Sequence, residues 1–176
     1  MKRRQVEKMT VTALFTAISV VLSVLESFLP TFAVLPPGAK PGLSNIIVMF
    51  SALSLGVPQT VFIILTKSFF AFLTRGAVAG LMSLAGGILS GICMLFVFRK
   101  LKIIGCVGAG VLSALCHNTG QLLVSFLTVG TWAVFGYAPV LLIVSVVTGV
   151  ITGTLLKASI PYFKGLEKHF SKEMEK

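Results

Sequence analysis

Three polar side chains with the capacity for specific chemistry lie close together in an apolar run, 103–129: His117, Asn118 and Gln121. The run is long enough for a membrane-spanning helix, and spacings of three and four residues place all three on one helical face. Polar groups at that depth are costly and usually face a bundle interior, a cavity or a bound ligand. The stretch therefore predicts either a hydrogen-bonded clamp between helices or a ligand-binding site, and on its own it leaves both open.

The composition is that of a membrane protein. The chain has 176 residues, of which 56% are hydrophobic and only 11% charged, and its mean hydropathy is +1.00. A net charge of +10 would suit nucleic-acid binding, but no basic stripe is interleaved with exposed aromatic residues. We therefore interpret the positive charge as marking the cytoplasmic side of a bilayer. The first apolar stretch is long and has no small-residue cleavage site, so we expect no removable signal peptide.

Six apolar stretches are predicted to form transmembrane helices in one compact all-α bundle, a single domain covering residues 1–176. The predicted spans are about 9–29, 42–55, 58–74, 77–98, 103–129 and 138–156, with short basic tails at both ends. Between the first two lies a loop, 31–41, whose prolines and glycine exclude a helix. The second span is short for a bilayer. Three cysteines within apolar runs have no metal or disulfide spacing, so we interpret them as small core residues.

The distribution of cations decides the topology. With six spans and a cytoplasmic N-terminus, only Lys40 and Arg75 fall outside, and Lys67 lies within the membrane. Five spans would place a basic loop at 99–102 and the basic C-terminal tail outside, against the positive-inside rule. The sequence thus predicts a multi-pass membrane protein with both termini in the cytoplasm. The cytoplasmic cations would be Lys2, Arg3, Arg4, Lys8, Arg99, Lys100, Lys102, Lys157, Lys164, Lys168, Lys172 and Lys176.

In this topology polar residues from four spans and the first loop meet in the outer half of the membrane. Three cations face one carboxylate there, so the predicted pocket favours an anionic ligand or a ligand with an anionic head. Two other interpretations stay open: Lys67 paired with Glu26, and Arg75 as an interface anchor. The predicted substrate-binding residues are Glu26, Lys40, Asn45, Lys67, Arg75, His117, Asn118 and Gln121.

Features needed for several enzyme classes are missing from the sequence. It contains no aspartate and no GxxxxGK[ST] phosphate-binding loop, and no Ser/His/acid or Cys/His set is visible. We therefore predict a protein that is not an enzyme, with no cofactor and no metal.

The first span carries a pattern for close helix contact. Ala13 and Ala17 lie one turn apart, which lets another helix approach closely, and they point away from Glu26. The same helix would thus present one face to the pocket and another to a neighbouring helix, either in this chain or in another protein.

Several of these motifs resemble the bacterial family called heptaprenyl diphosphate synthase component I, also known as the Gx transporter family. This resemblance implies that the membrane is a bacterial plasma membrane. The resemblance covers about residues 10–156, and the last of the motifs is its most specific part. The motifs are Glu26-Ser27-Phe28-Leu29-Pro30, Pro41-Gly42-Leu43-Ser44-Asn45, Ser83-Leu84-Ala85-Gly86-Gly87 and His117-Asn118-Thr119-Gly120-Gln121-Leu122-Leu123.

That family is similar to the substrate-binding S components of energy-coupling-factor (ECF) transporters. The resemblance implies a six-helix membrane subunit that holds a vitamin-like ligand in an outer pocket beneath the first loop. It also implies a transmembrane coupling protein docked on Ala13 and Ala17, with two cytoplasmic ATPases bound to that protein. Lys67 departs from the family pattern, in which arginine is more usual, so a bidentate contact to an anion is not expected there.

The enzymatic family name implies another role. A prenyl diphosphate synthase holds magnesium with aspartate-rich motifs, and this chain has no aspartate. The alternative to a transporter subunit is therefore a non-catalytic membrane accessory of heptaprenyl diphosphate or quinone-linked metabolism. Under either role the ligand would be a small anionic or amphiphilic molecule, such as a vitamin-like compound or an isoprenoid or quinone precursor.

Overall fold

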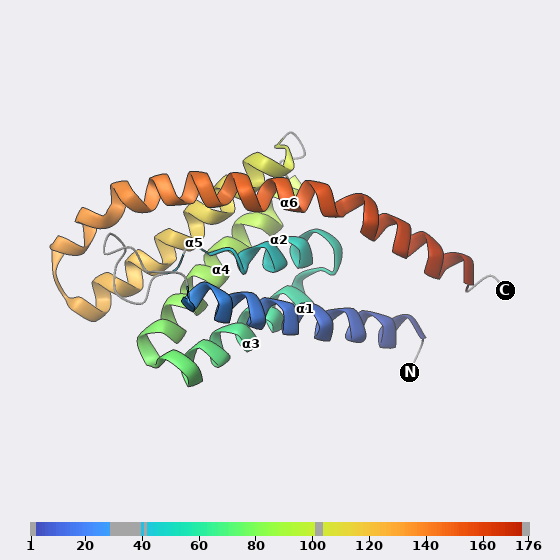
Figure 1. Cartoon of the computed structure of the whole chain (residues 1–176), viewed down its shortest axis with the longest axis horizontal. Coiled ribbons are helices and arrows are strands. Elements are labelled where there is room, and N and C mark those ends of the chain that lie inside the picture. Colours follow the sequence, from blue (N-terminus) through green and yellow to red (C-terminus); the bar gives the residue numbers. More distant parts are fainter. Residues whose placement is uncertain (1–2, 29–39, 41, 101–103, 174–176) are drawn as a thin grey trace.

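The structure, a computed structural model, describes residues 3–28, 40, 42–100 and 104–173, with the backbone alone at 3–4, 99–100 and 162–173. These residues form an all-α bundle (Figure 1). Its helices are α1 (Arg3–Phe28), α2 (Asn45–Ser54), α3 (Val57–Arg75), α4 (Ala77–Lys100), α5 (Cys106–Val129) and α6 (Ala138–Glu173), with a short 3-10 helix, η1 (Trp132–Tyr137), between α5 and α6.

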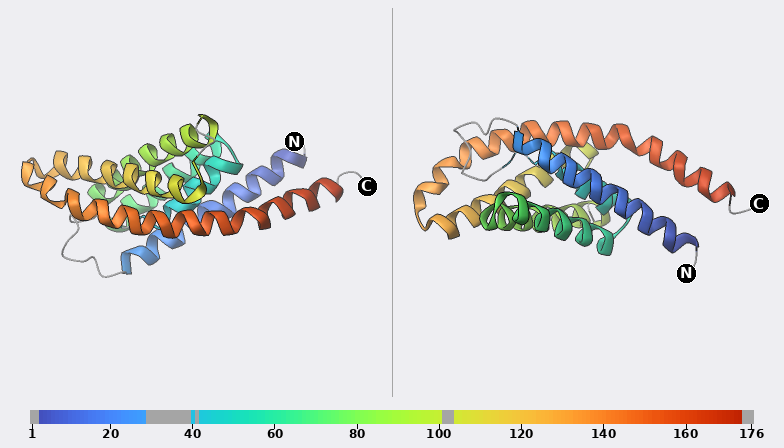
Figure 2. Two further views of the ribbon diagram at one scale, coloured as in Figure 1. Left: turned by 90° about the horizontal axis from the view of Figure 1, so that it is seen from above. Right: turned by 60° about the horizontal axis from the view of Figure 1, so that its bottom comes forward.

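Successive helices run back and forth along the bundle, so α1 begins at the same end of the molecule where α6 finishes (Figure 1). At that end both helices extend beyond the rest of the bundle (Figure 2). The closest packing joins α5 to α4 and α6, and α3 to α4. Among the described elements, α1 contacts only α2 and α3. The predicted six-helix bundle is confirmed.

Four helices are long and apolar enough to cross a bilayer: 5–28, 57–75, 77–98 and 132–161. They make the chain a multi-pass membrane protein. α5 has 24 residues, as α4 does, but His117, Asn118 and Gln121 lower its hydropathy. With 10 residues, α2 is about 15 Å long, half of a hydrocarbon core of about 30 Å. The structure thus provides four apolar candidate spans where the sequence predicted six.

The second predicted span, 42–55, is helical only from Asn45 to Ser54. Gly42, with a φ of 87°, adopts a left-handed conformation that a helix does not continue. At the other end of the chain, α6 runs to Glu173 rather than to the predicted 156 and continues through Pro161. Most of the predicted loop 31–41 lies outside the described residues.

Apolar and polar side chains are distributed as in a membrane bundle. Large apolar residues cover the outside, among them Leu14 and Leu25 of α1 and Phe69 of α3. A buried apolar cluster includes Phe15 and Phe50, whose rings meet edge to face at 5.0 Å. The inward face of α1 is otherwise mostly polar, and its buried polar residues are Thr12, Thr16, Ser19, Ser23 and Glu26.

Glycines bring α5 and α6 into backbone contact in the half of the bundle nearer the termini. A Cβ atom added to Gly110 would lie 2.3 Å from the carbonyl oxygen of Gly149 and 2.8 Å from the Cα of Gly153. Gly149 and Gly153, one turn apart on α6, thus both touch the backbone of α5. This contact fixes the half of α5 nearer the termini against α6. The other half of α5 contains the polar residues His117, Asn118 and Gln121.

Candidate functional site: a cation-rich cavity

One polar cavity lies among α1, the segment before α2, α3, α4 and α5, in the half of the bundle away from the termini. Its free space is about 270 Å³ including its open mouth, and polar side chains divide that space so that little more than a water molecule fits among them. The lining residues are Ser23, Glu26, Lys40, Ser44, Lys67, Arg75, Ala79, Met82, Ser83, His117 and Gln121.

Side chains from α1 and α5 hold the segment before α2 in place. The Ser44 backbone N–H and hydroxyl each donate to the Glu26 carboxylate, at 3.0 Å. The Lys40 backbone N–H donates to Gln121 Oε1 at 2.8 Å, and Gln121 Nε2 donates back to the Lys40 carbonyl at 3.2 Å. The Lys40 ammonium donates to the Ser23 carbonyl. Non-helical backbone inside a membrane bundle needs such partners, and here the site residues supply them.

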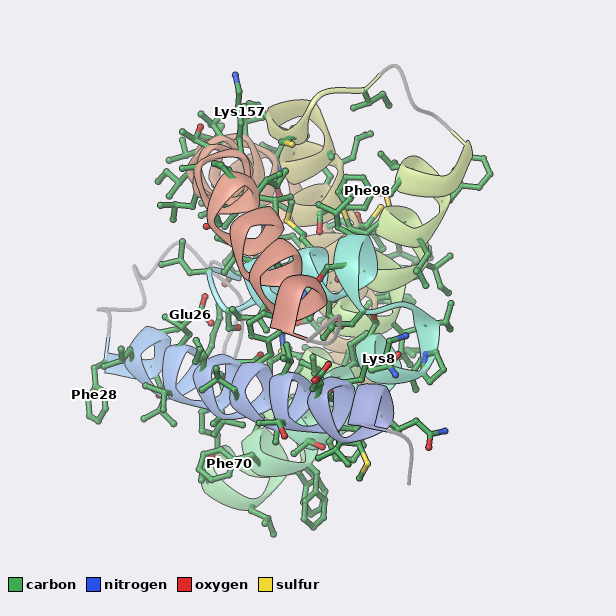
Figure 3. All side chains as sticks on the ribbon, turned by 90° about the vertical axis from the view of Figure 1, so that its right-hand side faces the viewer. Lys8, Glu26, Phe28, Phe70, Phe98 and Lys157 are labelled. Atoms are coloured by element: carbon green, nitrogen blue, oxygen red, sulfur yellow. The ribbon has the colours of Figure 1, made fainter. Side chains whose placement is uncertain are left out.

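Glu26 is therefore both a lining residue and a structural anchor. It lies on the side of α1 that faces the bundle, whereas Phe28 points away from it (Figure 3). Glu26 is 4% exposed. Both of its carboxylate oxygens accept hydrogen bonds from Ser44, which hold the carboxylate in the wall of the cavity that the cations also line.

His117 is held between two glycines. A Cβ atom on Gly42 would lie 3.0 Å from the imidazole Cδ2, and one on Gly86 would lie 2.7 Å from Nδ1. One turn further along α5, a Cβ atom on Gly120 would lie 2.7 Å from the backbone nitrogen of Gly86. Any side chain at these glycines would push the ring or the helices apart. Three of the motifs recognised in the sequence therefore meet around one imidazole ring.

Lys67 is the most unusual residue of the cavity. It is 2% exposed, and its ammonium nitrogen has no hydrogen-bond partner among the described residues. The structure shows no hydrogen bond between Lys67 and Glu26, the pairing that the sequence left open, because the Lys67 ammonium has no partner among the described residues. An unpartnered buried cation costs several kcal/mol. It therefore marks the place where an anion would be most strongly stabilised.

The electrostatic environment of Lys40 also indicates an excess of positive charge in the cavity. This residue lies between α1 and α2, outside the membrane-spanning helices. The pKa of its ammonium group is lowered to about 8, mainly by burial and then by the positive charge of Arg75; Glu26 opposes this shift, and Lys67 adds a smaller lowering. The cations therefore repel one another across the cavity, and their three positive charges exceed the one carboxylate that lines it.

The chain matches the family model for heptaprenyl diphosphate synthase component I over residues 15–159. It belongs to this family. No curated protein and no solved structure matches it.

Six of the eight substrate-binding residues predicted for this family member line the cavity, and two do not. Asn45 bridges α5 and α4, because its Nδ2 donates to Ser113 at 2.8 Å and its Oδ1 accepts from Ser90 at 3.0 Å. Asn118 points toward α6 and donates to Ser145 at 2.7 Å. The prediction that one face of α5 directs all three polar groups to one site is wrong for Asn118. A step of one residue turns the helix by about 100°, which separates it from His117.

Other lining residues were outside the predicted set. Ser23 continues the polar face of α1 toward Glu26, and Ser83 belongs to one of the family motifs, so both carried a signal in the sequence. Ala79 and Met82 carried none, because an apolar residue on a transmembrane helix faces lipid or core equally well. Within the described chain no three His, Cys, Asp or Glu residues are grouped to hold a metal ion.

Proposed function

We propose that this protein is the substrate-binding membrane subunit of an ECF-like transporter, and that the cavity captures the anionic group of a small anionic or amphiphilic ligand. The observation that carries the proposal is Lys67, a fully buried cation with no partner among the described residues, in a cavity that also contains Lys40 and Arg75. A lysine with a structural role would contact a carboxylate or solvent. A lysine that binds a ligand has no partner within the protein until the ligand is bound.

The size and chemistry of the cavity narrow the ligand class. Free space is limited, so only a compact group fits before the surrounding side chains move. Ammonium, guanidinium and amide donors surround it, and they match carboxylate or phosphate oxygens. We infer that the anionic head binds between Lys67 and Arg75 and that the less polar part of the ligand extends toward the open mouth.

Exposure on α1 supports a partner-docking role. Ala13 and Ala17 are both exposed on the surface of the bundle, so they do not pack on another helix of this chain in the structure. Larger apolar residues beside them, Leu14 and Ile18, are exposed as well. A transmembrane coupling protein, itself bound to cytoplasmic ATPases, would fit its helix over the two alanines.

The second candidate is a non-catalytic accessory subunit in heptaprenyl diphosphate or quinone-linked metabolism. The description of the family favours it, since it names a component of heptaprenyl diphosphate synthase. The lack of aspartate still argues against a catalytic role for this chain in that reaction. An anion-binding cavity suits both candidates, so partner identity must separate them.

Purification from native membranes in mild detergent tests whether the protein is a transporter subunit or an accessory subunit. We expect a transmembrane coupling protein and ATPases to co-purify, and Ala13→Leu with Ala17→Leu to abolish both this association and uptake. Ala158→Leu, a change of the same size at an exposed position of α6, is the matched control. Co-purification of a soluble prenyl synthase without ATPases would favour the accessory role. Unfolding of the isolated double variant would show that the alanines serve the bundle instead.

A further inference from the structure

A second concavity opens on the opposite side of α5 from the cation-rich cavity, between α5 and α6. Its free space is about 380 Å³ including the open side, and it contains no charged residue. Thr119 and Leu142 on its rim are exposed, so it opens onto the surface that faces lipid. Its other walls are Leu115, Asn118, Leu122, Ala138, Leu141 and Ser145.

The hydrogen bonds around Asn118 determine how its amide is oriented. The Ser145 hydroxyl donates its proton to the Leu141 carbonyl at 2.6 Å, so it can only accept from Asn118. The Asn118 group at 2.7 Å from Ser145 must therefore be the NH₂ group, which also lies 3.5 Å from the Leu141 carbonyl. This arrangement leaves the Asn118 carbonyl oxygen, Oδ1, as a buried acceptor with no partner in the described part of the chain.

Asn118 lies near the middle of the membrane. It is 12 residues after Cys106 and 11 before Val129, about 17 Å from each end of α5. The polar groups of ordinary phospholipids stay at the interface, and their acyl chains carry no donor that could satisfy Oδ1. An unsatisfied carbonyl at this depth costs about 1–3 kcal/mol.

We propose that this groove, defined by Leu115, Asn118, Leu122, Leu141, Leu142 and Ser145, binds a compact apolar molecule that enters from the bilayer and carries one hydroxyl group. The hydroxyl donates to Asn118 Oδ1, and the apolar body fills the space between the leucines. Because no cation lines the groove, it does not select the anion that the cavity on the other side of α5 favours. The site is an aliphatic or aromatic alcohol site, independent of the proposed transport function.

Photolabelling of the full-length protein in lipid nanodiscs tests the proposal. The probes are hexanol and hexane, each with a diazirine on the alkyl chain, at equal concentrations in the bilayer. We expect the alcohol to label α5 and α6 peptides at the groove about fivefold more than the alkane, the ratio given by one hydrogen bond worth about 1 kcal/mol. Equal labelling by both probes would overturn the proposal.

Two variants test the groove independently, so that the result does not depend on the folding of one of them. Asn118→Leu removes the acceptor and should make the two probes equal. Leu142→Trp changes a side chain that is 55% exposed, so it should fold normally while filling the groove and abolishing labelling by the alcohol there. Leu127→Trp, at a 78% exposed position of α5 outside the groove, is the control and should label as wild type. Unchanged labelling in Leu142→Trp would place the probe elsewhere and overturn the assignment.

Discussion

The two halves of α5 differ in what they place against their neighbours. Toward the termini, Gly110 brings the helix so close to α6 that no Cβ atom fits between the backbones. In the other half, His117 and Gln121 line a cavity shared with three cations. One helix thus contributes both to a tight seam, the backbone contact of Gly110 with Gly149 and Gly153, and to a polar cavity.

This difference shows how a membrane bundle separates stability from binding. Lipid is as apolar as leucine, so helices gain little from burying large apolar side chains and associate through small residues and van der Waals contact. Polar side chains at mid-membrane need partners, and they hold the helices apart around the space where a ligand would lie. We expect substitutions in the seam to change folding and substitutions in the cavity to change binding.

The largest expected effect is the presence or absence of cysteine labelling in intact cells. It tests which half of the bundle faces the outside of the cell. After the three native cysteines are replaced by alanine, a cysteine at Ala77 should react with an impermeant thiol reagent in intact cells, and one at Gly105 should not. Both positions are exposed at turns at opposite ends of the bundle. Positive-inside bias places 105 in the cytoplasm. Reaction at 105 from outside would invert the topology and make the cavity cytoplasmic.

A tight seam predicts a large loss of stability from a single methyl group. Gly110→Ala places its Cβ atom within 2.3 Å of the Gly149 carbonyl oxygen, which forces the backbones apart. Such overpacking costs about 1–3 kcal/mol, so we expect a clearly lower unfolding temperature in detergent. Gly105→Ala is the matched control, because no heavy atom lies within 4 Å of its Cβ position. Equal stability of the two variants would mean that the seam is looser than the structure shows.

For Lys67→Met in the cavity we expect a loss of ligand binding without a loss of stability. Methionine keeps most of the apolar volume and removes an unpartnered buried charge, so we expect stability to stay the same or to rise. Binding should fall more than tenfold, measured as the ratio of ligand-bound to free protein in native mass spectra after purification. Lys157→Met, at an exposed position of α6, is the control. Undiminished binding in Lys67→Met would remove the cavity as the anion site.

The sequence predicted the helical bundle because charge and breaker residues divide it into apolar stretches of helical length. It also predicted that Glu26, Lys67 and His117 would lie close together, because topology places each near the same depth. Depth does not define direction around a helix, and this is why Asn118 was assigned to the wrong side of α5. The length of α2 was beyond prediction too, since the hydrogen bonds that the preceding segment donates to Gln121 and Glu26 allow it to remain non-helical.

We expect pH to have a smaller effect on the affinity for the anionic ligand. In the free protein the pKa of Lys40 is lowered to about 8, and a bound anion would raise it, so binding should take up a proton above that pH. Affinity should be constant below about pH 7 and should weaken, by up to tenfold per unit, as the pH rises above about 8. Lys40→Gln should weaken binding at pH 7 and make this pH dependence less steep, since Lys67 remains in the cavity. A dependence of unchanged steepness in Lys40→Gln would assign the proton to another group.

The smallest expected effect tests whether Asn45 is a clamp rather than a ligand contact. Its amide joins Ser113 of α5 and Ser90 of α4 by two hydrogen bonds and does not line the cavity, so we expect it to hold the helices together rather than to contact a ligand. Ser113→Ala removes one neutral bond between helices, which in membranes is worth about 0.6 kcal/mol. We expect a slightly lower unfolding temperature and unchanged ligand binding. Thr119→Ala, which loses only a bond to the Leu115 carbonyl in its own helix, should be closer to wild type. If Ser113→Ala instead weakens binding as strongly as Lys67→Met, Asn45 belongs to the binding site. The site then extends along α5 from His117 to Ser113.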